Sequence, residues 1–220
     1  MRKLTLLAMA AAGALALTGC GLLPTSTFED SAILSDPVRS VRLDVGDGRV
    51  TLRGRDGGTE VSLIRTVEYR GDRPGVTYRV EDGVLVLSGC GRNCAVHYEV
   101  DLPAGLPVTG GTSNGALTLS RVGALDLHTS NGRIEGTDLS GGGVDVETSN
   151  GAVEISTAVA QDIRVRTSNG EVTVTVPDGP YRVATDTNNG SRDVAVTDDP
   201  SATHSLDLST SNGDITVRTR

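Results

Sequence analysis

The tetrapeptide Thr-Ser-Asn-Gly recurs through the second half of this chain, and its period constrains the fold more than any other feature. Its Asn residues, counting one Thr-Asn-Asn-Gly variant, lie 17, 19, 19, 20 and 23 residues apart. A period near 20 residues is typical of repeat architectures, in which each copy buries its apolar face only against its neighbours. The corner positions are Asn114, Asn131, Asn150, Asn169, Asn189 and Asn212.

Apolar residues keep a fixed register around each Asn. Val144 and Val146 precede Asn150, and Val153 and Ile155 follow it, with polar residues between them. Alternation with period two predicts two strands, each with one buried face, joined at an Asn-Gly corner. Asn and Gly tolerate positive φ, which explains why they turn a strand sharply. Two weaker copies have Asp-Gly corners, Asp47-Gly48 and Asp82-Gly83.

Two all-β folds preserve this alternation. Each copy could be a hairpin with a type I′ turn, which would make the chain a meander of Asn-Gly β-hairpins. Each copy could instead be one rung of a β-solenoid (β-helix) with about 17 to 20 residues per rung. Stacked corners favour identical polar side chains, because amides and hydroxyls can hydrogen-bond from rung to rung. The repeated Thr and Ser therefore favour a single-domain, right-handed solenoid whose corner Asn side chains are partly buried and bonded to each other.

The first residues predict export. Arg2 and Lys3 precede an uncharged apolar run from Leu4 to Leu17, which is shorter than the about 20 residues of a membrane-spanning helix and is typical of a signal-peptide core. The run ends in Leu-Thr-Gly-Cys, which resembles the lipobox of bacterial lipoproteins. That resemblance implies that Cys20 carries a diacylglyceryl group and becomes the mature N-terminus. An ordinary secretory signal with an incidental Cys is the alternative.

The chain accordingly divides into three parts. Residues 1–19 are the predicted lipoprotein signal peptide. Residues 20–39, with two prolines and little alternation, are the predicted lipidated tether. Residues 40–220 are the predicted solenoid, with irregular capping rungs at 40–110 and regular repeats at 111–220.

Cys90 and Cys94 remain once Cys20 is assigned to lipid. An exported protein meets an oxidising environment, which favours a disulfide between these two residues. A metal site that also uses His97 is an alternative, but no fourth ligand lies nearby in sequence, and zinc sites prefer two close ligand pairs. Free thiols are the third possibility.

Charge limits the partners. The chain has 20 Lys and Arg against 28 Asp and Glu, so it lacks the basic stripe that nucleic acid requires. Removal of the signal takes two basic residues and leaves 18 against 28, a formal charge of −10. Apart from the membrane that would hold the anchor, this charge favours cationic envelope components or another envelope protein as partners.

The sequence offers no catalytic constellation. None of its three His stands near a Ser or Cys nucleophile pattern, so we expect no catalytic residues, no metal and no cofactor. Gly141 to Gly143 predicts a loop between rungs. Outward acidic residues alternate with basic ones, which predicts a mixed, solvated face; they are Asp126, Asp145, Glu147, Glu171 and Asp207, interrupted by His128, Arg164 and Arg166.

Three features together resemble the bacterial "putative adhesin" family of β-strand-repeat domains of unknown function. They are the lipobox, the Val-x-Val-x-Thr-Ser-Asn-Gly-x-Val-x-Val repeats, and the lead-in Tyr-Glu-Val-Asp-Leu-Pro at 98–103. The resemblance covers residues 40–220 and implies a β-solenoid at the cell surface, with no catalytic residues to carry over.

The function expected from these features is that of a membrane-anchored extracytoplasmic lipoprotein. It would be a non-catalytic, adhesin-like binding or scaffolding module of the cell envelope. The alternative is a polysaccharide-active enzyme on a pectate-lyase-like solenoid. Such an enzyme needs clustered charged groups and usually aromatic side chains, whereas this chain has no Trp and one Phe.

Overall fold

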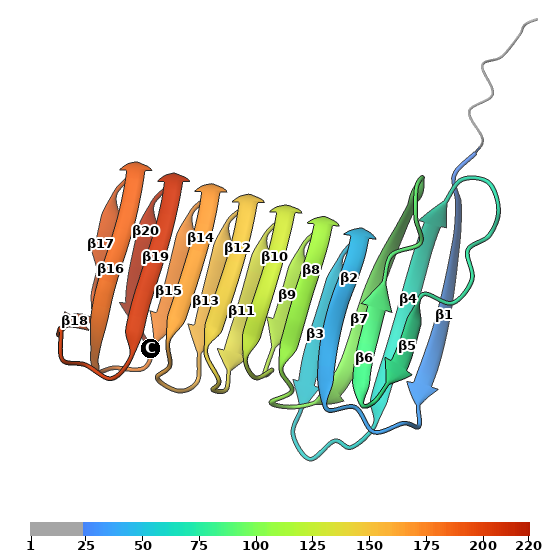
Figure 1. Cartoon of the computed structure of the whole chain (residues 1–220), viewed down its shortest axis with the longest axis horizontal. Coiled ribbons are helices and arrows are strands. Elements are labelled where there is room, and N and C mark those ends of the chain that lie inside the picture. The colour runs from blue at the N-terminus through green and yellow to red at the C-terminus, as the bar shows by residue number, and fades with distance from the viewer. Residues whose placement is uncertain (1–23) are drawn as a thin grey trace, which may run out of the picture.

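The computed structural model describes residues 24–220, which form twenty strands in two ten-stranded sheets stacked face to face (Figure 1). The first sheet contains, in spatial order, β1 (Ser26–Leu34), β4 (Val61–Tyr69), β7 (Cys94–Pro103), β3 (Val50–Arg55), β9 (Leu117–Ser120), β11 (Ile134–Leu139), β13 (Val153–Thr157), β15 (Val172–Val176), β20 (Ile215–Thr219) and β17 (Arg192–Val194). The second contains β18 (Thr197–Asp198), β16 (Pro180–Asn189), β19 (Ser205–Asn212), β14 (Ile163–Asn169), β12 (Val144–Asn150), β10 (Leu125–Asn131), β8 (Val108–Asn114), β2 (Ser40–Asp47), β6 (Val84–Ser88) and β5 (Tyr78–Glu81).

Each regular repeat contributes one strand to each sheet. β12 pairs in parallel with β10 and β14, and β13, which follows it in the chain, pairs in parallel with β11 and β15. A hairpin would pair β12 with β13 in antiparallel fashion, so the meander is wrong. The fold is the predicted all-β solenoid, in which each repeat crosses from the second sheet to the first at its Asn-Gly corner.

The core is a column of stacked aliphatic side chains between the two sheets. Val144, Val146, Val153 and Ile155 of one rung are at most 4% exposed, and the other regular rungs repeat this arrangement. Full burial of one such side chain contributes about 1.5 to 3 kcal/mol relative to exposure. A space this narrow is filled by Val, Leu and Ile, which explains how the chain builds a core without Trp.

The N-terminal end of the stack is closed by antiparallel strands. β4 pairs antiparallel with β7, and β1 pairs antiparallel with β4 over all nine of its residues. β1 lies inside the segment predicted to be a tether, so that prediction is wrong for residues 26–34. Its alternation was hidden because one inward position is Asp30, whose Oδ1 lies 3.0 Å from Nε of Arg65, a side chain that is 2% exposed.

Spatial order departs from chain order at the other end. The last repeat, β19 and β20, lies between the rung of β14 and β15 and the rung of β16 and β17, and Figure 1 shows these red strands inside the orange ones. The inward positions of the outer rung explain this order. They include Thr185 and Arg192, which stand level with Leu208 and Ile215 of the inserted rung. An interior position would bury Arg192, so this copy takes the outside.

Candidate functional site

The corner Asn side chains form one continuous row along the edge where the second sheet turns into the first. In each contact Nδ2 donates to an Oδ1 one rung closer to the N-terminal end of the stack, with N···O distances of 2.6 to 2.9 Å. The row ends at a carboxylate. In order, it contains Asn189, Asn212, Asn169, Asn150, Asn131, Asn114 and Asp47.

The row differs from the expectation in two respects. Asn212 stands between Asn169 and Asn189, because the last repeat is inserted. The Asn side chains are also exposed rather than partly buried. Water can replace each amide bond when a side chain is removed, so each bond contributes less than a buried one.

The Thr of each motif is the buried polar residue of the corner. The hydroxyl of Thr148 donates to the carbonyl oxygen of Gly132 in the neighbouring rung at 3.2 Å, and Thr167 donates to Gly151 in the same way. Thr129 is an exception, because its Oγ1 is buried and has no partner within residues 24–220. The sequence showed that this Thr recurs but not that its hydroxyl satisfies a backbone group of the next rung.

Close approach of stacked backbones explains the corner glycines. A Cβ added to Gly132 would lie 1.9 Å from the carbonyl oxygen of Gly115, and one added to Gly151 would lie 2.1 Å from that of Gly132. Neither glycine has a positive φ, and neither does Asn150. The explanation by positive φ is therefore wrong at these corners. The whole motif serves stacking and presents no reactive group.

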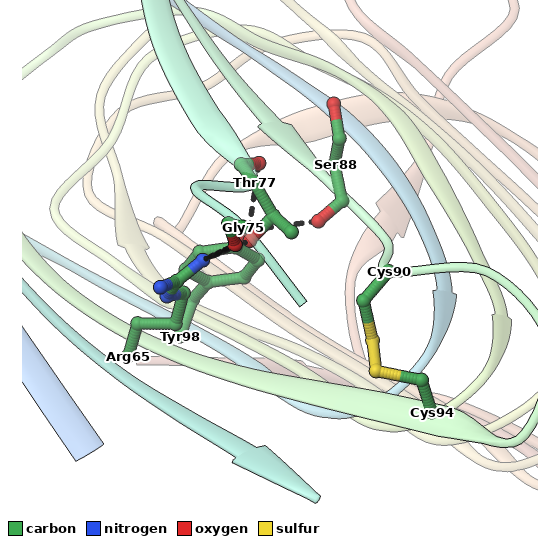
Figure 2. The surroundings of a disulfide bond; sticks show 7 residues. All are labelled: Arg65, Gly75, Thr77, Ser88, Cys90, Cys94 and Tyr98. Carbon is green, nitrogen blue, oxygen red and sulfur yellow. Dashed lines mark hydrogen bonds between the residues drawn. A yellow bond between two sulfur atoms is a disulfide. The ribbon is translucent and has the colours of Figure 1, made fainter. Parts of the chain in front are cut away.

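The disulfide between Cys90 and Cys94 is present, and it closes an enlarged corner (Figure 2). β6 and β7 form one more rung against β2 and β3, with Leu87 level with Leu43 and Tyr98 level with Val50. Eleven positions separate the first two residues of this rung, against seven in its neighbour, so this corner has four extra residues. The bonded sulfurs are no longer thiolates, which removes the metal interpretation.

The disulfide corner lies beside a buried network that joins the cap to the stack (Figure 2). The Tyr98 hydroxyl is within 2.7 Å of the carbonyl oxygen of Ser88 and within 2.5 Å of the Thr77 hydroxyl, which also accepts from Nη1 of Arg65 at 2.9 Å. Burial raises the pKa of Tyr98 to about 12. A phenol with that pKa stays protonated at neutral pH, so this network is structural.

A groove of about 430 Å³ lies on the outer face of the second sheet. Its lining includes Ala124, Gly142 and Gly143, whose small size leaves the hollow open, and the side chains of Asp126 and Asp145. These two carboxylates stand level with each other on the paired strands β10 and β12. Like charges at such positions repel each other, so a cation between them would be favoured.

The groove as a whole is acidic. Nε of Arg164 lies 3.0 Å from Oδ2 of Asp207, whereas Asp126 and Asp145 form no ion pair within residues 24–220. Asp162 also lines it, and hydrogen bonds from the backbone N–H and the hydroxyl of Ser205 hold the pKa of this carboxyl below its usual value. Four carboxyl groups therefore accompany one guanidinium.

Sequence reasoning identified three of these four carboxyl-bearing residues as exposed but missed both the groove and Asp162. It expected a mixed, solvated face without a site. The triple glycine from Gly141 to Gly143 was the available signal, because it removes side chains beside the acidic positions.

Other predicted features lie elsewhere. His97 accepts a hydrogen bond at Nδ1 from the backbone N–H of Arg49, at 3.0 Å. The described part of the chain has no group of three or more His, Cys, Asp or Glu arranged to hold a metal ion. It also has no helix long and apolar enough to cross a membrane. Cys20 and the predicted signal peptide fall outside the described residues.

Comparison with known proteins identifies relatives of the fold. The Toastrack DUF4097 family model matches residues 107–218. The crystal structure of a "putative cell adhesion protein" from Clostridium sporogenes is 15% identical, with a TM-score of 0.51, over 89% of this chain and 100% of that one. A "putative adhesin" from Bacteroides fragilis is 14% identical, with a TM-score of 0.42, over 88% and 97%. The first of these likenesses shows a shared fold. A search of curated proteins gives no match.

Proposed function

This chain belongs to the Toastrack DUF4097 family, and we propose that it is a non-catalytic binding module, lipid-anchored outside the cytoplasmic membrane, that binds cationic envelope partners in the groove of its second sheet. The groove carries the proposal. It combines small and apolar lining residues with four carboxyl groups and a single Arg. A Lys or Arg side chain fits such a site, because its stem is apolar and its head is charged.

Two features support an extracytoplasmic location. The disulfide is suited to an oxidising compartment. The lipobox-like sequence before Cys20 would supply the anchor. Since β1 begins at Ser26, residues 20–25 alone would separate the lipid from the fold, and six extended residues span about 20 Å. The antiparallel cap would then be the end of the stack nearest the membrane.

A polysaccharide-active enzyme is the second candidate, because carboxylates from several rungs do converge in the groove. Glycoside hydrolysis needs one carboxyl group whose pKa is raised, so that it can act as a general acid. The pKa of Asp162 is shifted in the opposite direction. The lining also contains no aromatic residue on which a sugar ring could stack. The groove is therefore better suited to binding than to catalysis.

Binding of a lysine-rich peptide to the soluble Cys20→Ser chain tests this function. We expect the double substitution Asp126→Asn and Asp145→Asn to weaken binding about tenfold or more, and added salt to weaken binding to the unsubstituted groove. Glu135 and Glu154 provide the matched control, since they stand level on paired strands of the opposite sheet. Their change to Gln removes the same charge and should have little effect.

Equal losses in the two double variants would show that net charge attracts the peptide and that the groove does not. Depolymerisation of a surface glycan by the unsubstituted chain would instead establish the enzyme.

A further inference from the structure

The rung at the C-terminal end of the stack depends on the repeat that follows it in the chain. Within residues 24–220, β16 pairs with β18 and β19, and β17 pairs with β20. Neither strand pairs with β14 or β15. The last repeat therefore fills a slot, with parallel partners on both sides of both of its strands.

The slot makes specific demands on what fills it. Its apolar positions hold Leu206, Leu208, Ile215 and Val217, all of which are 0% exposed. Its Asn must act twice in one ladder, and Asn212 donates to Asn169 at 2.9 Å while it accepts from Asn189 at 2.8 Å.

The corner of the slot is equally restrictive. A Cβ on Gly213 would lie 2.2 Å from the carbonyl oxygen of Gly170. The Thr210 hydroxyl donates to that same carbonyl at 3.0 Å. A segment that fits must therefore present alternating aliphatic residues, an inward Thr, an Asn and a Gly in this register. Residues 205–219 have this sequence, and a second copy of the chain supplies it again.

We propose that this slot is a strand-exchange site, which takes residues 205–219 from a second copy of the chain. The contacts in the slot are the same whether the repeat comes from its own chain or from another. The two cases differ in the connection, residues 199–204, which is largely exposed and carries the repeat back into the stack. Tethering favours insertion within one chain in dilute solution, and a high local concentration favours exchange.

Cross-linking between two differently substituted chains tests the exchange. Arg166 of β14 and Ser209 of β19 stand level in the parallel register and project outward. Arg166→Cys and Ser209→Cys are made in separate Cys20→Ser chains, which are mixed, unfolded with the native disulfide intact, and refolded together. A short bismaleimide then joins thiols that lie side by side. Exchange predicts covalent heterodimers whose yield rises with the protein concentration during refolding.

The control uses a pair of strands that are not part of the slot. His128 and Glu147 stand level on β10 and β12, so His128→Cys and Glu147→Cys report random encounters between refolded chains. We expect about tenfold more heterodimer from the slot pair than from this pair at high concentration. Equal yields from the two pairs, with all four chains refolded, would overturn the proposal.

Light scattering keeps the test decisive if a cysteine variant does not refold. The Cys20→Ser chain without added cysteines is refolded at increasing concentration, and its mass is measured after separation by size. Exchange predicts a dimer that persists on dilution, because its two slots must open before it dissociates. Monomer alone at every concentration would overturn the proposal.

Discussion

Nδ2 of Asn114 donates a hydrogen bond of 2.6 Å to Oδ1 of Asp47, and this contact fixes the direction of the whole amide row. A carboxylate only accepts, whereas an amide can donate from one atom and accept at the other. Asp47 therefore makes every Asn beyond it donate toward the N-terminal end of the stack. The backbone bonds at the same corners run the other way, and the N–H of Gly132 donates to Asn150 of the next rung.

Replacement of Asp47 tests its role as the terminal acceptor. We expect Asp47→Ala to lower the free energy of unfolding by about 1 kcal/mol, because the row loses its last acceptor at a water-accessible site. Asp47→Asn keeps an acceptor oxygen and should lose less than half of that amount. Urea unfolding measures both variants. An Asn variant as unstable as the Ala variant would contradict a role based on hydrogen bonding.

The inward Thr should matter more than the exposed Asn. Thr148→Val strands the buried carbonyl of Gly132 and should cost about 1 to 3 kcal/mol, whereas Asn150→Ala should cost well under 1 kcal/mol because water replaces its bonds. Thr129 supplies the control, since its buried hydroxyl has no partner in the described residues. Thr129→Val should be neutral or stabilising. Equal costs at Thr129 and Thr148 in urea unfolding would be inconsistent with this account.

Corner glycines should tolerate no side chain. Gly151→Ala places a methyl group against a backbone carbonyl that cannot move without unstacking two rungs, so we expect a loss of more than about 3 kcal/mol or failure to fold. Gly46→Ala is the control, because nothing lies within 4 Å of its added Cβ. Thermal unfolding of the two variants compares them. A well-folded Gly151→Ala protein would refute the close-approach explanation.

The buried Tyr98 should make the fold sensitive to alkali. Its folded pKa of about 12 is above the ordinary value of 10.0, so the folded state holds the phenol proton more tightly than the unfolded chain does. The resulting stability is complete below pH 10 and is lost as the pH rises toward 12, by up to about 2 to 3 kcal/mol. Free energies of unfolding across this range should fall more steeply for the native chain than for Tyr98→Phe. Parallel curves would count against this assignment.

Membrane attachment should depend on one residue. If Cys20 carries the lipid, Cys20→Ser should move the protein from the membrane fraction to the soluble fraction, because no acyl chain remains to be buried. Fractionation of cells that express either form measures this. An unchanged membrane fraction in the variant would exclude acylation of Cys20 as the anchor.

The solenoid was predictable because its evidence is local. Alternation around Asn150 specifies two strands with one buried face each, and the repeated polar corner distinguishes stacking from hairpins. β1 escaped prediction because its alternation includes Asp30, and only the distant Arg65 makes a carboxylate acceptable at an inward position. Local patterning cannot reveal such a partner.

The order of the rungs and the groove also depend on long-range relations. Every Asn-Gly repeat has the same register, so pairing alone does not tell whether Asn169 neighbours Asn189 or Asn212. Burial decides this order, because Arg192 is disfavoured between rungs. The groove requires side chains from rungs that are far apart in the chain, such as Asp126 and Asp207. The sequence identifies these residues as exposed but does not show that they meet.

The inserted last repeat has a consequence for synthesis and export. A chain that crosses the membrane from its N-terminus releases residues 180–198 before the repeat that they will lie against. Until residue 219 has emerged, the open face of β14 and β15 has no matching rung. A premature stop after residue 204 would therefore leave two rungs unformed rather than one. The final fifteen residues act as the completion signal of the fold, so truncated products should be easily recognised by envelope proteases.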